Sequence, residues 1–206
     1  MRRLDEPGQR TLAQAIARLE ASSALEIVVA LRGRSGSYLA TALIAGLAIA
    51  WATLAVQVLA PWPIPHLALL VEPPLLGLLG GWLVARSPLL LRLLTPGPVR
   101  RRRALREAMV TFVEKSIALT SGRTGLLVYF SLLERRLVVL GDRAVTGVVT
   151  ATPWAERVAA FERAVQGAPD GAAFAAALEA FAAPLAAALP PRPTDENELP
   201  DEVVLS

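Results

Sequence analysis

The sequence contains no cysteine, one histidine and one lysine, and these shortages restrict the chemistry it can perform. Without cysteine the chain forms no disulfide, holds no thiolate-bound metal and has no cysteine nucleophile. The single histidine, His66, lies in a Pro-rich turn, which argues against a Ser-His-Asp triad or a multi-histidine metal site within one chain. The sequence therefore predicts no catalytic residue.

Charged residues are missing from a long segment, residues 38–59, and are rare in a second, residues 67–94, where only Glu72, Arg86 and Arg92 interrupt the apolar run. A helix rises about 1.5 Å per residue, so about 20 residues cross the hydrocarbon core of a bilayer. Each segment is long enough, and the turn between them is short. The sequence therefore predicts a transmembrane helical hairpin.

The basic residues explain a pI near 10.1 and indicate the orientation of the hairpin. They flank the apolar segments, and we expect six of them to contact the membrane surface: Arg32, Arg34, Arg100, Arg101, Arg102 and Arg103. The outer turn, residues 60–71, has no Lys or Arg. Basic flanks stay on the cytoplasmic side and attract anionic lipid. We therefore expect a multi-pass protein of the cytoplasmic (inner) membrane with both termini cytoplasmic, bound to the lipid bilayer and not to nucleic acid.

We expect no signal peptide in residues 1–20, because acidic and basic side chains recur along them and no apolar core segment interrupts them.

Small residues recur at four-residue spacing in both apolar segments, at Ala42, Gly46 and Ala50 in the first and at Gly77 and Gly81 in the second. Such stripes allow helix backbones to approach closely in lipid. They predict either packing of the two helices within one hairpin or a face for a homo-oligomer.

Two acidic features leave alternatives open. Glu72 near the outer end of the second segment is either an interfacial carboxylate or a proton or ion site. The acidic, Pro-containing tail, residues 190–206, is either free and extended or folded back onto the basic residues 100–103.

The remaining sequence predicts a small α/β domain that the hairpin interrupts. Continuous apolar runs at 25–31 and 125–131 indicate buried parallel strands, and 135–141 an antiparallel strand. Amphipathic helices are expected at 5–21, at 101–119, from Thr152 and from the N-cap Asp170. The helix at 101–119 should have Gly122 as its C-cap and bury one stripe of side chains: Leu105, Met109, Phe112, Ser116 and Leu119. We expect domain segments at 1–36 and 96–189, the hairpin at 37–95 and the tail at 190–206.

Four short stretches resemble the TPM domain family, in particular a bacterial membrane-protein branch. They are TSGRTGLLVYFSLLER at 120–135, GDRAV at 141–145, SALEI at 23–27 and NELPD at 197–201. The resemblance implies an α/β sandwich with the hairpin inserted in the domain. The family includes a plant thylakoid protein with acid phosphatase activity and proteins that assist photosystem repair.

The expected topology gathers polar residues at the two edges of the sheet. The helical crossover makes strands 25–31 and 125–131 parallel, so Glu26, Arg123, Thr124 and Asp142 should meet at the edge far from the membrane. Two carboxylates, a hydroxyl and an Arg could hold a divalent cation or a phosphate. Alternatively, Arg123 and Asp142 form a surface ion pair, and Glu26 accepts backbone N–H groups.

The edge near the membrane should gather Ser131, Glu134, Arg135 and Arg32. We expect this second group to be a solvated hairpin turn, or else a contact with lipid head groups.

These observations favour a non-catalytic accessory or scaffold domain that is anchored at the cytoplasmic membrane face, with a membrane protein or a second copy as partner. A metal-assisted phosphatase, which the resemblance implies, is the alternative. It is weakened by the absence of an Asp-x-Asp pair and by few acidic residues. A small oligomeric transport component is a further alternative, because two helices enclose no path alone.

Overall fold

The computed structural model describes residues 5–149, 151–166, 170–191 and 204–205. The chain divides into two compact units: residues 1–35 with 101–206, here called the sheet unit, and residues 36–100, here called the hairpin unit. The second unit is thus inserted in the first, as expected, with a second boundary five residues later than the sequence predicted.

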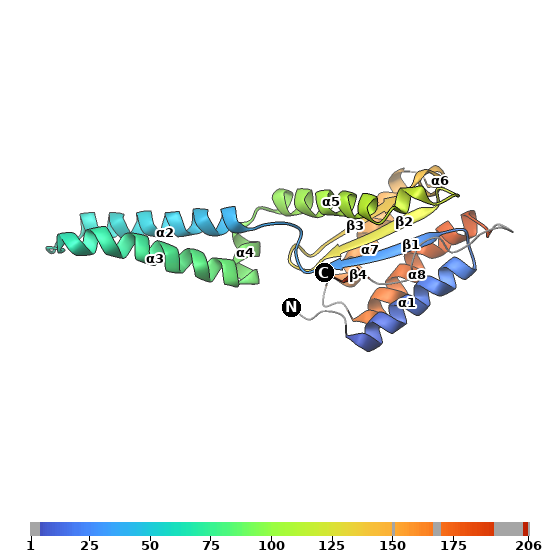
Figure 1. Ribbon diagram of the computed structural model, residues 1–206, viewed down its shortest axis with the longest axis horizontal. Helices are drawn as coiled ribbons and strands as arrows, with labels where there is room; N and C mark the ends of the chain where they lie inside the picture. The colour runs from blue at the N-terminus through green and yellow to red at the C-terminus, as the bar shows by residue number, and fades with distance from the viewer. Residues whose placement is uncertain (1–4, 150, 167–169, 192–203, 206) are drawn as a thin grey trace. The chain divides into compact units, whose positions relative to one another are not determined.

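The sheet unit contains a four-stranded mixed sheet in the order β3-β2-β1-β4. β1 (Glu26–Arg32) and β2 (Gly125–Ser131) are parallel and in register from Glu26 opposite Gly125 to Arg32 opposite Ser131. β3 (Arg136–Gly141) runs antiparallel to β2 (Figure 1). The predicted α/β fold with three mixed strands is confirmed.

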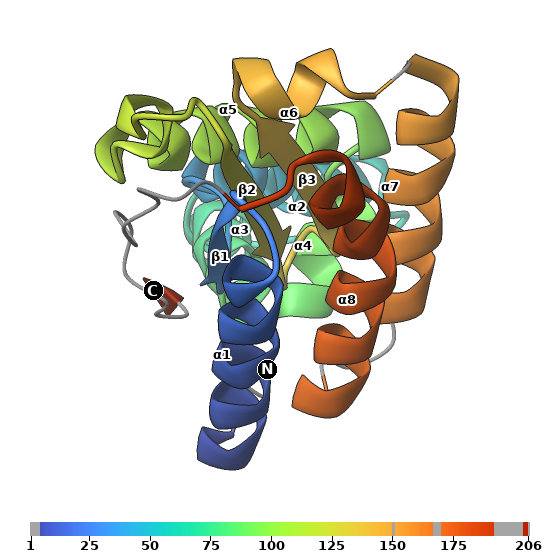
Figure 2. The same ribbon diagram turned by 90° about the vertical axis from the view of Figure 1, so that its right-hand side faces the viewer.

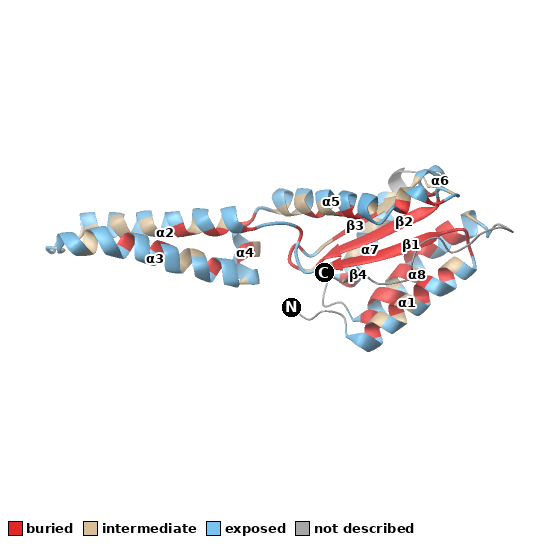
Figure 3. Cartoon of the chain, viewed as in Figure 1, coloured by how far each residue is buried: buried red, intermediate tan, exposed pale blue. Residues whose placement is uncertain are grey.

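Helices cover both faces of this sheet, so β1 and β2 are buried on both sides (Figures 2 and 3). One face packs against α1 (Glu6–Ala21), α7 (Ala151–Val165) and α8 (Gly171–Ala188). The other face packs against α5 (Gly97–Glu114) and the 3-10 helix η1 (Ile117–Leu119). A short helix, α6 (Arg143–Gly147), follows β3. Continuous apolar strands require two such covers, because neither face can remain in water.

Two aspartates cap helices: Asp170, which the sequence predicts as a cap, and Asp5, which it predicts only as the start of its helix. Asp5 accepts a hydrogen bond from the N–H of Gly8 at 3.0 Å, and Asp170 accepts one from Ala172 at 3.4 Å. α1 and α8 then cross where Gly8 meets Gly171, and a Cβ on Gly171 would overlap the Gly8 backbone. This crossing therefore requires glycine at position 171.

The predicted helix over 101–119 is wrong at its end and in its buried face. α5 ends at Glu114, and Ser116 takes the left-handed conformation with φ 55°, so Gly122 is not the C-cap. Ala104, Ala108 and Thr111 face the sheet, whereas the predicted stripe of large residues is exposed at Leu105 and Met109. Small side chains let α5 lie close to β1 and β2.

The hairpin unit consists of α2 (Leu39–Leu59), α3 (His66–Arg86) and the short α4 (Pro88–Leu94). A Cβ on Gly46 would lie 2.6 Å from the carbonyl oxygen of Gly77, and one on Gly77 would lie 2.8 Å from Ala50 Cβ. A Cβ on Gly81 would lie 3.0 Å from the Ala42 oxygen. All five predicted small residues thus line the α2–α3 contact within one chain, where the backbones touch.

Three helices of the described part of the chain are long and apolar enough to cross a membrane: α2, α3 and α8. α8 differs from the other two because its apolar side chains Phe174, Leu178, Phe181 and Leu185 are buried in the core of the sheet unit. α2 and α3 expose most of their surface.

The end of the acidic tail differs from both expectations. Val204 and Leu205 form β4, which pairs in parallel with Ala30 and Leu31 of β1. Most of the tail, including the NELPD stretch at 197–201, lies outside the described residues.

Candidate functional site

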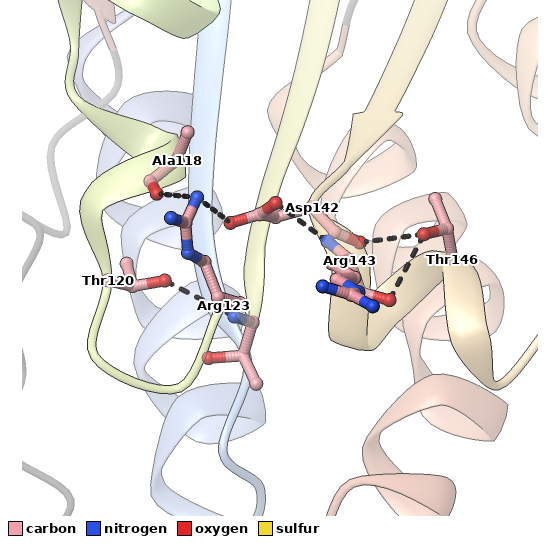
Figure 4. Close-up of polar contacts among 7 residues, drawn as sticks. Ala118, Thr120, Arg123, Asp142, Arg143 and Thr146 are labelled. Atoms are coloured by element: carbon pink, nitrogen blue, oxygen red, sulfur yellow. Dashed lines mark hydrogen bonds and ion pairs between the residues drawn. The ribbon is translucent and has the colours of Figure 1, made fainter.

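Two of the far-edge residues lie close together: Arg123 is in the loop that enters β2, and Asp142 follows the end of β3 (Figure 4). Arg123, with φ 54°, donates from Nη1 to the carbonyl oxygen of Ala118 at 2.8 Å. The same nitrogen lies 3.8 Å from Asp142 Oδ2. Asp142 is also the N-cap of α6, because its Oδ1 accepts the N–H of Arg143 at 2.7 Å. Asp142 therefore carries a structural role in addition to its ion pair.

Glu26 does not join Arg123 and Asp142 at one point. Glu26 begins β1 and Asp142 follows β3, so β2 lies between them. Neighbouring strands are about 4.8 Å apart, which separates the two backbones by about 10 Å. The described residues contain no group of three or more His, Cys, Asp or Glu that could hold a metal ion. The predicted cation site thus has its carboxylates on opposite sides of a strand.

Thr124, the fourth predicted residue, is buried, and its backbone N–H and carbonyl groups form hydrogen bonds that stabilise the loop. Its N–H donates to Thr120 Oγ1 at 3.2 Å, and its carbonyl oxygen accepts the N–H of Glu26 at 3.4 Å. The contacts of Arg123, Asp142 and Thr124 therefore favour the expected ion pair over a ligand site.

Two of the near-edge residues, Ser131 and Glu134, form a buried polar cluster with Ser35 and Tyr129, and these four residues are here called the Glu134 cluster. Glu134, 1% exposed, accepts hydrogen bonds from Ser131 Oγ and, at 2.9 Å, from the N–H of Ser35. Ser35 Oγ and the Tyr129 hydroxyl lie 2.7 Å apart and share a hydrogen bond. The expectation of a solvated turn is therefore wrong, because the turn is covered by the chain leaving β1.

Backbone hydrogen bonds complete this cover. The N–H groups of Leu132 and Leu133 donate to the carbonyl oxygens of Arg32 and Gly33 at 2.9 and 3.0 Å. Arg135, at φ 48°, closes the turn before β3. The cluster therefore fixes residues 32–35, the last of the sheet unit before the hairpin unit, onto the β2–β3 turn.

Burial raises the pKa of the Tyr129 phenol to about 12, against a lowering by its hydrogen bond to Ser35. The nearby negative charge of Glu107 raises this pKa further. Tyr129 thus stays protonated in any physiological buffer, so the cluster holds a neutral phenol beside Ser35 and serves packing and hydrogen bonding rather than proton transfer.

Arg32 is engaged within the sheet unit. Its guanidinium lies 3.3 Å from Glu107 and 3.8 Å from Glu114, both on α5. Of the six residues predicted to contact the membrane surface, Arg34, Arg101 and Arg102 are exposed, and Arg100 and Arg103 are partly buried. Arg32 therefore joins α5 to β1, and no local pattern around Arg32 predicts this role.

Comparison with known proteins supports the fold and adds no function. No protein-family model matches the chain, and no curated protein does. The NMR structure of BA42 protein from the psychrophilic bacterium Bizionia argentinensis is similar, with a TM-score of 0.59 and 15% sequence identity. The match covers 100% of this chain and 97% of that chain. At this identity the similarity concerns the fold alone.

Proposed function

We propose that this chain is a non-catalytic accessory or scaffold protein of the cytoplasmic membrane, with a TPM-like domain anchored by the hairpin unit. The observation that carries the proposal is the surface of that unit. Large apolar side chains project outward along both helices, for example Leu43, Ile44, Leu47, Trp51, Val58, Leu70, Leu75, Leu78 and Trp82. Leaving so many in water would cost on the order of tens of kcal/mol.

The backbone of the hairpin unit suits lipid as well. Each of α2 and α3 is 21 residues long, about the length that crosses a bilayer core. Helices satisfy their own N–H and C=O groups, which lipid requires. Glu72 accepts a hydrogen bond from Gln57 Nε2 at 2.6 Å, so its carboxylate has a polar partner across the hairpin near the outer turn. This pairing favours the interfacial role for Glu72.

Arg34, Arg101 and Arg102 are exposed on the chain that flanks the hairpin, which supports placing both termini in the cytoplasm. Anchoring would then hold the folded domain at the inner membrane face, where a membrane protein or a second copy could be its partner.

Topology can be tested without removing any native thiol, because the chain has no cysteine. Trp62→Cys, in the outer turn, should react with a membrane-impermeant maleimide in intact cells. Arg10→Cys, exposed on α1, should react only after the membrane is permeabilised. Labelling of Arg10→Cys in intact cells would contradict the proposed orientation, and release of the protein by alkaline carbonate would contradict the anchor.

The absence of catalysis is tested on purified protein in detergent with a generic phosphomonoester and divalent cations. We expect no turnover. Hydrolysis that is lost in Asp142→Asn and Glu26→Gln but kept in the exposed control Glu179→Gln would establish the phosphatase alternative and end the scaffold proposal.

A further inference from the structure

The exposed apolar side chains of the sheet unit are concentrated on one helix. Among its described residues, the large exposed ones are Leu105, Met109, Val110, Val113, Leu119 and Val148. All but Val148 belong to α5 and η1, whereas α1, α7 and α8 turn their large apolar residues into the core. Met109 is 53% exposed and Val113 74%. A surface of this kind on a single face marks an interaction site.

The pattern on α5 is two parallel rows, because residues four apart lie above one another on a helix. Leu105, Met109 and Val113 form one row, and Arg102, Arg106 and Val110 form the next. These six residues are here called the α5 outer face. The opposite face of the helix, Ala104, Ala108 and Thr111, is buried against the sheet. The outer face is therefore available to a partner while α5 stays folded in its domain.

The acidic residues of α5 also lie on a different face of the helix from Arg102 and Arg106. The two acidic residues, Glu107 and Glu114, both pair with Arg32. Arg102 and Arg106 are exposed on the outer face, with no acidic residue in either row. An apolar row beside arginines is complementary to a surface that is negative outside and apolar beneath, which describes the head-group region of an anionic bilayer.

The chain itself places such a bilayer nearby if the proposed anchor is correct. α4 exposes Leu89, Leu93 and Leu94, and only Thr95 and Pro96 separate α4 from α5. The N-terminal end of α5 thus begins two residues after the last apolar turn of the hairpin unit. We propose that the α5 outer face docks on the anionic inner leaflet and holds the sheet unit against the membrane. This inference rests on the proposed anchoring.

The test uses the full chain in liposomes with an environment-sensitive fluorophore on a single introduced cysteine. Met109→Cys probes the α5 outer face, and Arg10→Cys on α1 is the exposed control. In vesicles that contain phosphatidylglycerol, we expect the Met109→Cys probe to be quenched by lipids that carry a doxyl group near the head group. We expect weak quenching in phosphatidylcholine alone, and none for Arg10→Cys in either.

Charge reversal supplies the second arm. Each arginine near an anionic surface strengthens attraction about fivefold, so Arg102→Glu with Arg106→Glu should lower the docked-to-free ratio by at least about tenfold. The matched control, Arg157→Glu with Arg163→Glu on α7, changes the net charge equally and should leave quenching unchanged. Equal loss in both double variants would overturn the proposal, because it would reflect net charge alone.

Further outcomes distinguish lipid docking from self-association and from failure of the anchor. A Met109→Cys probe that shifts to the blue without lipid quenching would mean that a second copy covers the face, and the lipid proposal would fall. A Leu79→Cys probe on α3 separates this failure from that of the anchor. If Leu79→Cys is quenched by lipid and Met109→Cys is not, only the docking inference is wrong. If neither is quenched, the membrane anchor is wrong as well.

Discussion

In the sheet unit Phe174 and Leu178 have no exposed surface, whereas in the hairpin unit Trp51 is 64% exposed and Leu78 73%. The size of the side chains packed inside each unit is reversed, large in the sheet unit and small in the hairpin unit. Rings fill the core of the sheet unit, with Phe174 against Phe130 and Phe161 at centroid distances of 6.1 and 5.4 Å. Glycine and alanine fill the contact between α2 and α3. Large apolar side chains thus lie inside the sheet unit and on the surface of the hairpin unit.

The largest expected effect is a difference in stability between two variants, each of which loses one aromatic ring from a different unit. Phe174→Ala removes a fully buried ring and should lower the free energy of unfolding by about 3–5 kcal/mol. Trp51→Ala removes a ring that faces outward and should change it by less than about 1 kcal/mol in detergent. Urea denaturation of the detergent-solubilised chain, followed by circular dichroism, measures both. Equal losses would mean that the hairpin unit also buries its large residues.

Glu134→Ala should cause the next-largest loss of stability, because it leaves the buried N–H of Ser35 and the Ser131 hydroxyl without their acceptor. We expect a loss of about 2–4 kcal/mol in the same assay. Glu179→Ala, which removes an exposed carboxylate, is the control and should cost only a few tenths, about 0.3 kcal/mol. A neutral result for Glu134→Ala would show that water reaches the β2–β3 turn.

The outcome for the Glu134 cluster also shows where sequence reasoning stopped. Topology correctly brought Ser131, Glu134 and Arg32 to one edge. The burial of Ser131 and Glu134 depends on Ser35, which is 99 residues from Glu134 along the chain and lies in a short Gly- and Arg-containing stretch with no regular pattern. Local patterns contain no information on such a long-range contact, whereas the predicted cap Asp170 depends only on neighbouring residues.

The face of α5 was mispredicted for a different reason. Its periodicity allows two buried faces, one with Leu105 and Met109 and one with Ala104 and Ala108. Hydrophobicity favours the larger residues, but the close approach to β1 and β2 admits only the smaller ones. The α2–α3 contact could be predicted because small residues at four-residue spacing are themselves the signal of close backbone approach between two helices.

Tyr129 should make the stability of the sheet unit depend on pH in alkaline solution. The pKa of Tyr129 is about 12 when folded and 10.0 ordinarily, so the unfolded chain loses this proton first. The contribution is complete below pH 10 and is lost as the pH rises to 12, by up to about 3 kcal/mol. The difference in urea stability between wild type and Tyr129→Phe should fall over this window. A flat difference would contradict the raised pKa.

Gly77→Leu should break the hairpin unit alone. Its side chain would enter the Gly46 backbone, at a cost of about 1–3 kcal/mol that separating the helices relieves. Spin labels at the exposed positions Leu47 and Leu79 should then report a longer and broader distance distribution. The control Leu78→Ala shortens the exposed side chain next to Gly77 and should leave the distance distribution unchanged. An unchanged distribution in Gly77→Leu would indicate that α2 and α3 do not require close backbone contact.

The smallest expected effect concerns ion pairs, and it asks whether burial or distance decides their strength in the sheet unit. Arg32 lies 3.3 Å from Glu107, and both side chains are about three-quarters buried. Arg18 lies closer to Glu179, at 2.6 Å, but both side chains are more exposed. Less solvent and salt screening should make Arg32→Ala the costlier change, at about 0.5–1 kcal/mol against about 0.3 kcal/mol for Arg18→Ala. Raising the salt concentration during urea denaturation should reduce the loss in Arg18→Ala proportionally more. If Arg18→Ala proves the costlier variant, short distance outweighs burial, and the Arg32 contact with α5 is incidental to how the sheet unit is held.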